Sequence, residues 1–83
     1  MMFLQKQKIR IMFTYKDYEK RRDTVIKYLI YSFRVDKYTA EDIFQDGYED
    51  YHKSLDKINN GDFDDSGLSG YIKGIVKYKF LRS

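Results

Sequence analysis

The sequence predicts a small all-α bundle of three main helices. Three stretches repeat apolar residues every three or four positions, which is the spacing of one helix face. No segment alternates polar and apolar residues over four or more positions with hairpin turns around it, so strands are not expected. Residues 34–38 and 59–67 are polar, separate the three patterns, and are expected to be turns. Three helices with short connections form a bundle.

The first helix is expected over residues 15–33. Thr14 can cap it, because Asp17 follows three residues later and this pair can satisfy the free amides of a helix start. The apolar face of this helix consists of Tyr18, Val25, Ile26, Leu29 and Phe33.

The second helix is expected over residues 40–58, with Thr39 as its cap and Asp42 three residues later. Its apolar face consists of Phe44, Tyr48, Tyr51, Leu55 and Ile58. Its opposite face is acidic and carries Glu41, Asp42, Gln45, Asp46, Glu49 and Asp50. Gly47 weakens a helix, so we expect it to allow close packing against the first or third helix.

The third helix is expected from residue 68 to at least residue 82, with Asp65 or Ser66 as its cap. Its apolar side consists of Leu68, Ile72, Ile75, Val76 and Phe80. Gly70 and Gly74 remove side chains from one strip of this helix, which allows either close helix packing or the approach of another backbone.

Cations and tyrosines alternate along the third helix. The residues concerned are Tyr71, Lys73, Lys77, Tyr78, Lys79 and Arg82. Cations suit phosphates and aromatic rings suit unstacked bases, which predicts nucleic-acid binding. In the competing interpretation Tyr71 packs inward and the lysines are only solvated.

Before the first helix, residues 3–12 are expected to form a short extra helix or to lie over the core. Their apolar members, which need cover, are Phe3, Leu4, Ile9 and Met12. We therefore expect an N-terminal extension over residues 1–14 and one helical domain over residues 15–83.

Composition excludes several classes of protein. The 83-residue chain has no cysteine, and therefore no disulfide framework and no thiolate metal site. No apolar run approaches the roughly 18 residues of a membrane span. Residues 1–13 are interrupted too often by Lys and Arg to be a signal peptide. We expect a soluble, cytoplasmic protein.

No catalytic residue and no cofactor are expected. The single histidine, His52, lies between Tyr51 and Lys53 with no serine at a neighbouring helical position, so it lacks the nucleophile that a catalytic pair requires. An exposed or interface histidine is the expected role, and the chain is not expected to be an enzyme.

No metal site is expected either. Asn60, Asp62 and Asp64 alternate as calcium ligands do. However, Asp65 stands where a calcium loop needs Gly, and Tyr71 stands where it needs a bidentate Glu. We expect this stretch to be a turn and a helix cap, with Phe63 holding it to the core.

Charge is distributed in three blocks. Residues 1–35 carry nine Lys or Arg against three Asp or Glu, residues 36–67 carry three against ten, and residues 68–83 carry four against none. Such a layout favours two partners, one that binds carboxylates and one that is anionic; three solvated helix faces are the alternative.

Three segments together resemble the conserved second region of bacterial RNA polymerase sigma factors of the sigma-70 family. They are DYEKRRDTVIKYLIYSF, AEDIFQDGYEDYHKSL and LSGYIKGIVKYKFLR, within residues 15–83. In the second, the order Ala-Glu-Asp, two residues, Gln-Asp matches the family pattern. In the third, Tyr71 matches a Trp or Tyr position, whereas Tyr78 stands where many members have Asn. The extracytoplasmic-function type is the most similar.

The resemblance implies two partners. Glu41, Asp42, Gln45, Asp46 and Glu49 would dock on the clamp coiled coil of the largest polymerase subunit. The third helix, with Tyr71, Lys73, Lys77, Tyr78, Lys79 and Arg82, would face the minus-ten promoter element and its extruded non-template base. An anti-sigma factor is a further candidate partner, and no membrane contact is implied.

The family's second DNA-binding domain, a helix-turn-helix, is absent from the sequence. We expect the chain to be a fragment or a natural single-domain relative. The alternative function is a sigma-like helical adaptor or decoy that binds a protein partner without opening promoters.

Overall fold

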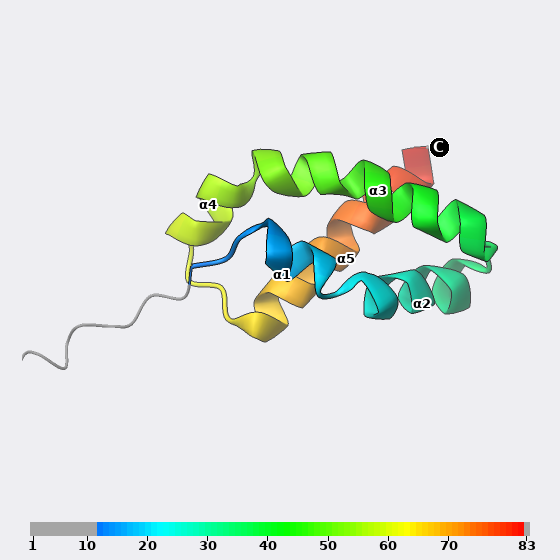
Figure 1. Ribbon diagram of the computed structural model, residues 1–83, viewed down its shortest axis with the longest axis horizontal. Helices are drawn as coiled ribbons and strands as arrows, with labels where there is room; N and C mark the ends of the chain where they lie inside the picture. Colours follow the sequence, from blue (N-terminus) through cyan, green and yellow to red (C-terminus); the bar gives the residue numbers. More distant parts are fainter. Residues whose placement is uncertain (1–11, 83) are drawn as a thin grey trace, which may run out of the picture.

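The computed structural model describes residues 12–82, and every regular element in that range is an α-helix (Figure 1). The helices are α1 (Tyr15–Glu19), α2 (Arg22–Phe33), α3 (Lys37–Lys53), α4 (Leu55–Asn60) and α5 (Asp65–Arg82). The predicted all-α bundle is therefore confirmed, with α2, α3 and α5 as its three main helices. The prediction for residues 3–12 lies outside the described residues except for Met12, which is 64% exposed.

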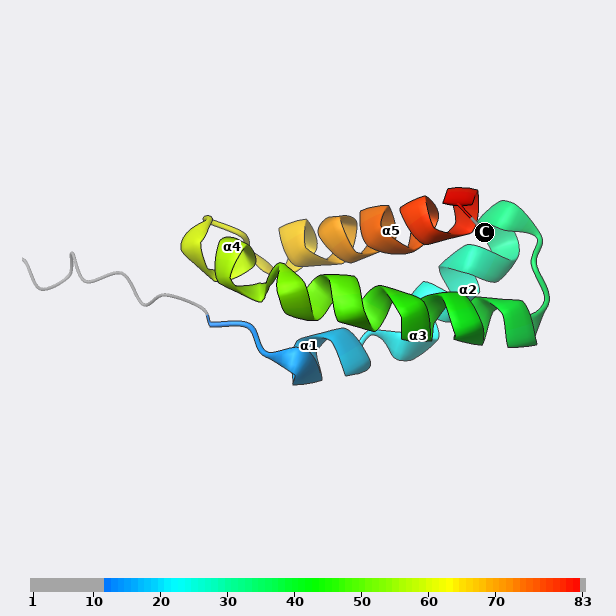
Figure 2. The same cartoon turned by 90° about the horizontal axis from the view of Figure 1, so that it is seen from above.

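Helix α3 is the element around which the others pack. Helix α5 runs along one side of α3 and α1 lies on the other, while α2 crosses behind α3 in the view of Figure 2 and contacts both α3 and α5. The largest fully buried side chains are Tyr18, Tyr51, Leu29, Ile58, Leu68, Ile72, Val25 and Val76. All belong to the predicted apolar faces. Other members of those faces, such as Phe33 and Phe80, pack at the edge of the same core.

The prediction of one continuous helix over residues 15–33 is wrong. The chain turns at Lys20 and Arg21, where the Arg21 amide donates to the Tyr18 carbonyl at 3.1 Å, and the helix restarts at Arg22. The turn separates α1 from α2 without removing either apolar face from the core, because Tyr18 and Val25 are both buried.

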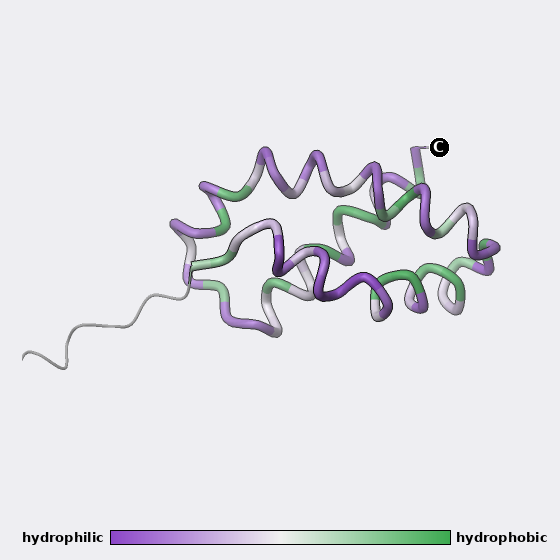
Figure 3. Tube along the Cα trace, viewed as in Figure 1, coloured by the Kyte–Doolittle hydropathy of each residue, from purple (hydrophilic) through white to green (hydrophobic). Residues whose placement is uncertain are grey.

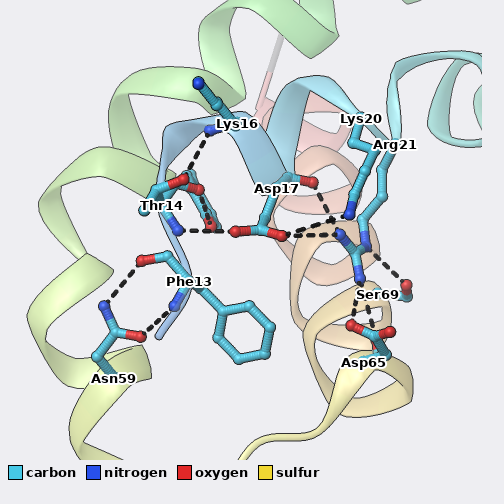
Figure 4. Close-up of polar contacts among 10 residues, drawn as sticks. Phe13, Thr14, Lys16, Asp17, Lys20, Arg21, Asn59, Asp65 and Ser69 are labelled. Atoms are coloured by element: carbon cyan, nitrogen blue, oxygen red, sulfur yellow. Dashed lines mark hydrogen bonds and ion pairs between the residues drawn. The ribbon is translucent and has the colours of Figure 1, made fainter. Parts of the chain in front are cut away.

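The side chain of Arg21 accounts for this turn. Its guanidinium donates to the Asp17 carbonyl at 2.8 Å and to Ser69 Oγ at 3.0 Å, and it pairs with the Asp65 carboxylate at 3.2 Å (Figure 4). The Arg21 side chain is 13% exposed, so its contacts with Asp17 and Ser69 are partly buried, whereas the Asp65 side chain is 85% exposed. Arg21 thus ties the junction of α1 and α2 to the first turn of α5.

The helix starts follow side-chain caps. The predicted Thr14 cap is confirmed: Thr14 Oγ1 accepts from the Lys16 amide at 3.2 Å, and the Asp17 carboxylate accepts from the Thr14 amide at 2.8 Å (Figure 4). This reciprocal pair satisfies two amides that lack partners within the helix.

The other two predicted caps are wrong by a few residues. Helix α3 starts at Lys37 because the Asp36 carboxylate, not Thr39, is the cap; it accepts from the Thr39 amide at 2.8 Å. Hydrogen bonding to Thr39, through its side chain first and its backbone amide second, lowers the pKa of Asp36. Helix α5 starts before residue 68 because the Asp64 carboxylate accepts from the Gly67 amide at 2.7 Å. In each case an earlier aspartate captures the free amides.

The predicted helix over residues 40–58 also divides. Its break lies at Ser54, whose amide donates to the Asp50 carbonyl at 3.0 Å and the Tyr51 carbonyl at 3.1 Å. Helix α4 then continues in a new direction and still places Ile58 in the core.

Phe13 is a core residue that the sequence patterns did not indicate. Its side chain is 3% exposed, and Asn59 holds its backbone from both sides (Figure 4). The Asn59 amide group donates to the Phe13 carbonyl at 3.0 Å, while its oxygen accepts from the Phe13 amide at 2.8 Å. The end of α4 therefore fixes the chain just before α1.

Gly47 lies where α3 meets both α1 and α5. A Cβ atom at this position would be 2.6 Å from Tyr18 Oη and 3.2 Å from Ile75 Cγ2. Tyr18 cannot retreat easily, because its hydroxyl donates to the buried Phe44 carbonyl at 2.6 Å. The predicted close packing at Gly47 is confirmed. At Gly74, by contrast, a Cβ would meet nothing within 4 Å.

Replacement of these two glycines by alanine should have opposite effects on stability. Gly47→Ala should lower the free energy of unfolding by about 1–3 kcal/mol, because the methyl group overfills the core. Gly74→Ala should raise it by roughly 1 kcal/mol through helix propensity alone. Urea unfolding followed by circular dichroism measures both. In a Tyr18→Phe background the cost of Gly47→Ala should shrink; equal stability of the two glycine variants would contradict the packing.

Stability should also fall at high pH through Tyr51. Its hydroxyl donates to the Thr14 carbonyl at 2.8 Å, and burial raises its pKa from 10.0 to about 12. The neutral phenol therefore stabilises the fold below about pH 10, and this contribution is lost as pH rises towards about 12. Urea midpoints at about pH 9 and about pH 11 should differ less in Tyr51→Phe than in the parent. The same loss in both proteins would exclude this role.

Candidate functional site

Two sets of polar residues lie on α3 and α5, and those of α5 spread around the helix, since Lys73 contacts α2 and Lys79 contacts α3. The acidic surface on α3 consists of Glu41, Asp42, Gln45, Asp46 and Glu49. The basic aromatic surface on α5 consists of Tyr71, Lys73, Lys77, Tyr78, Lys79 and Arg82. Figure 3 shows that hydrophilic residues prevail along α3, whereas α2 and the middle of α5 carry hydrophobic stretches. The two surfaces therefore differ in charge and in the hydropathy of the helices that carry them.

The acidic surface faces outward because the other side of α3 is fixed in the core. The buried residues of α3 are Ala40, Ile43, Phe44, Gly47 and Tyr51. A helix turns about 100° per residue, which places the five polar side chains opposite this buried set. Four of them are exposed, and Glu41 is half-buried.

Most of the acidic surface is free of structural contacts. Glu41 pairs with Arg22 of α2 at 3.0 Å, and Glu49 pairs loosely with Lys53 at 3.7 Å. The side chains of Asp42, Gln45 and Asp46 make no hydrogen bond or ion pair with any residue of the range 12–82. The structure therefore leaves three adjacent groups available to accept hydrogen bonds from a partner.

A groove of about 480 Å³ adjoins the acidic surface between α1 and α3. Its lining residues are Tyr15, Gln45, Tyr48, Glu49 and His52. Gln45 and Glu49 belong to both features, so the groove and the acidic surface are continuous. His52 is exposed, as expected, and lies at one edge of this groove. Tyr15, Tyr48 and His52 were not among the predicted binding residues.

Lys77, Tyr78 and Arg82 are the exposed members of the basic aromatic surface on α5. Tyr78 is 52% exposed; Arg82 Nη1 donates to its hydroxyl at 2.9 Å, and the Arg82 guanidinium lies 5.4 Å from its ring centroid. Lys77 is exposed and has no ion pair within residues 12–82. These three side chains form the accessible part of the surface.

The other cations of α5 take part in packing. Lys79 pairs with Asp50 of α3 at 3.3 Å, and both side chains are about one-third exposed. The Lys73 ammonium lies 5.3 Å from the ring centroid of Tyr28 on α2. These contacts connect α5 to its neighbours, so Lys73 and Lys79 are less available to a ligand than Lys77.

Tyr71 is half-buried, which is intermediate between an exposed ring that stacks on a base and a ring that packs into the core. Its ring packs edge-to-face on Phe63, with centroids 5.5 Å apart, and Phe63 in turn packs against the core as predicted. Tyr71 also lines a second groove of about 530 Å³ between the C-terminal end of α3 and α5. The other lining residues are Asp50, Lys53, Ser54, Gly74, Ile75 and Tyr78.

The sequence predicts that some residues of the second groove lie together, but not all of them. Tyr71, Gly74 and Tyr78 share a helix face by their spacing. The α3 residues Asp50 and Lys53 come beside them through the tertiary packing, and no sequence signal indicates this. The groove offers two aromatic rings, one carboxylate and one ammonium to a planar polar group.

Within residues 12–82, no three His, Asp or Glu side chains are grouped so that they could hold a metal ion. No helix in the same range combines the length and apolar character that crossing a membrane would need.

No family model, no curated protein and no solved structure matches this chain.

Proposed function

We propose that this chain is a sigma factor domain that docks on the clamp coiled coil of RNA polymerase and binds the minus-ten promoter element. The observation that carries this proposal is the separation of an acidic surface on α3 from a basic aromatic surface on α5. The acidic surface suits the polymerase clamp and the basic aromatic surface suits promoter DNA. The family resemblance assigns α3 and α5 to these same two partners.

The acidic surface supports docking on a protein. Asp42, Gln45 and Asp46 are exposed and serve no intramolecular hydrogen bond within residues 12–82. Like charges held together on one face repel each other unless a basic partner compensates them. A row of carboxylates around an amide can bind arginines and polar groups of a facing helix.

The outer face of α5 supports binding of a nucleic-acid strand. Gly70 and Gly74 each lower helix stability by about 1 kcal/mol relative to Ala, yet nothing packs on them. They leave a strip without side chains beside Lys77 and Tyr78, on which a strand backbone can lie. Lys77 and Arg82 can then contact phosphates, while Tyr78 can stack on an unpaired base.

A second candidate, the sigma-like adaptor that does not melt promoters, is favoured by one observation. Lys73 and Lys79 are engaged with Tyr28 and Asp50, which leaves two of the four α5 cations for DNA. Either function places the protein in the cytoplasm with the polymerase. An anti-sigma factor would compete for the same surfaces.

Removal of two charges from the acidic surface should weaken polymerase binding. Asp42→Asn combined with Asp46→Asn should raise the Kd for bacterial core polymerase at least about tenfold, equivalent to about 1.4 kcal/mol. The physical reason is the loss of two charge-assisted contacts from exposed groups that stabilise nothing within the fold. Fluorescence anisotropy of labelled protein measures the Kd.

Asp56→Asn combined with Asp62→Asn is the matched control, because both aspartates are exposed and lie outside α3. It removes the same charge and should leave the Kd unchanged. Equal weakening in the two double variants would show that only net charge matters, and would contradict docking through α3.

Binding of a single-stranded minus-ten oligonucleotide, measured with core polymerase present, should depend on salt through α5. Each phosphate contact on a single strand contributes about −0.7 to the slope of log affinity against log salt concentration. Lys77→Gln should therefore make the slope shallower by about 0.7. Lys57→Gln, an exposed change on α4, should leave it unchanged.

The same experiment separates the two candidates. An oligonucleotide signal that depends on Lys77 supports promoter binding. Normal binding of core polymerase without any oligonucleotide signal would favour the adaptor.

A further inference from the structure

The groove between α1 and α3 has an aromatic floor and an acidic rim. Tyr48 forms part of the floor, and its ring is fixed by stacking on the buried Tyr18 ring, with centroids 5.3 Å apart. Tyr15 lines the groove from α1 and is 46% exposed. Because Tyr48 is held in place before any ligand arrives, the protein loses little conformational entropy when a group packs on this ring.

Two carboxylates, Glu49 and Glu19, lie beside the tyrosines of this groove. Glu49 and the Gln45 side chain line the groove from α3. Glu19, on the next turn of α1 after Tyr15, lies close enough to contribute to the raised pKa of Tyr48, after burial. Glu19 is exposed and forms no ion pair within residues 12–82. Within the described chain, Glu49 has only the loose pair with Lys53 at 3.7 Å.

We infer that this groove is the seat of one arginine side chain from the protein that docks on the acidic surface. Resting on the proposed function, this inference names the contact that the groove would provide. A guanidinium can lie flat on Tyr15 or Tyr48 while its N–H groups donate to Glu49 and to the Gln45 oxygen. The charge of the rim excludes anionic side chains.

Arginine fits these groups better than lysine does. Its planar guanidinium has five donors in a fixed plane, stacks on tyrosine rings and is weakly hydrated. A lysine ammonium is a strongly hydrated point charge that can contact the rim but cannot cover the floor. Discrimination between the two cations is therefore the signature of the site.

The test uses N-acetyl-arginine amide as the probe and N-acetyl-lysine amide as its match, both titrated into the ¹⁵N-labelled full chain at constant ionic strength. Saturable shifts should appear at Tyr15, Gln45, Tyr48, Glu49 and His52 with the arginine probe. The lysine probe should bind several-fold more weakly. Tyr15→Ala should weaken arginine binding roughly three- to tenfold, as expected for loss of a cation–π contact.

Tyr31→Ala is the matched control, since Tyr31 is a 75% exposed tyrosine on α2, outside the groove. It should bind the arginine probe as the parent does. Equal affinity for both probes, or shifts spread over all exposed carboxylates, would overturn the proposal. A third outcome would also overturn it. If replacement of Lys6, Lys8 and Arg10 by Gln changes the groove signals in the absence of probe, the chain's own N-terminal segment is the occupant.

The probe experiment does not require polymerase. If the arginine probe binds the groove and core polymerase does not bind the chain, the groove stands and the proposed function fails. If core polymerase binds and Tyr15→Ala leaves that binding and the probe shifts unchanged, the groove assignment fails alone.

Discussion

The close approach of α3 to α1 and α5 at Gly47 is the constraint on which the rest of the structure depends. Tyr18 reaches the space that a side chain at Gly47 would occupy, donates its hydroxyl to the Phe44 carbonyl, and stacks on the Phe44 ring 4.4 Å away. This contact fixes the rotation of α3 about its own axis. Rotation by one residue would bring acidic side chains towards the core, where charges are costly to bury. The outward direction of the acidic surface is thus a consequence of core packing.

Helix α5 is tied at both ends and free along one face between them. Arg21 binds its first turn through Asp65 and Ser69, and the Lys79 pair with Asp50 holds its last turns against α3. These contacts distinguish the polar side chains of α5 that stabilise the fold from those that have no structural partner. Lys79 has a structural partner, whereas Lys77 has none within residues 12–82. The proposed function uses the unpaired Lys77 together with Tyr78 and Arg82, whose side chains bond only to each other in the described part of the chain.

The core could be predicted from the sequence because helical spacing determines which side chains share a face. Leu29, Tyr51 and Ile72 were all identified in this way, whereas the packing role of Gly47 followed from the cost of glycine within a helix. Helices α3 and α5 start earlier than expected because Asp36 and Asp64 compete with the expected caps for the free backbone amides. Both aspartates lie near enough in sequence to bind these amides first.

The grooves and the break at Arg21 could not be predicted, because they arise from contacts between distant parts of the chain. Arg21 meets Ser69, and Tyr15 comes to lie beside Tyr48, only after the helices have packed. Periodicity within one helix carries no information about such pairs. For the same reason, the α5 cations looked equivalent in the sequence, although Asp50 engages Lys79 and leaves Lys77 free.

Site-specific photo-crosslinking in one assembled complex tests the central claim most directly. A photoreactive residue would replace Asp42 in one protein sample and Tyr78 in another, each bound to core polymerase and promoter DNA. Two separate binding surfaces require that position 42 crosslinks to the largest polymerase subunit and position 78 to the non-template strand. Crosslinks from both positions to protein alone would contradict a DNA-binding surface on α5.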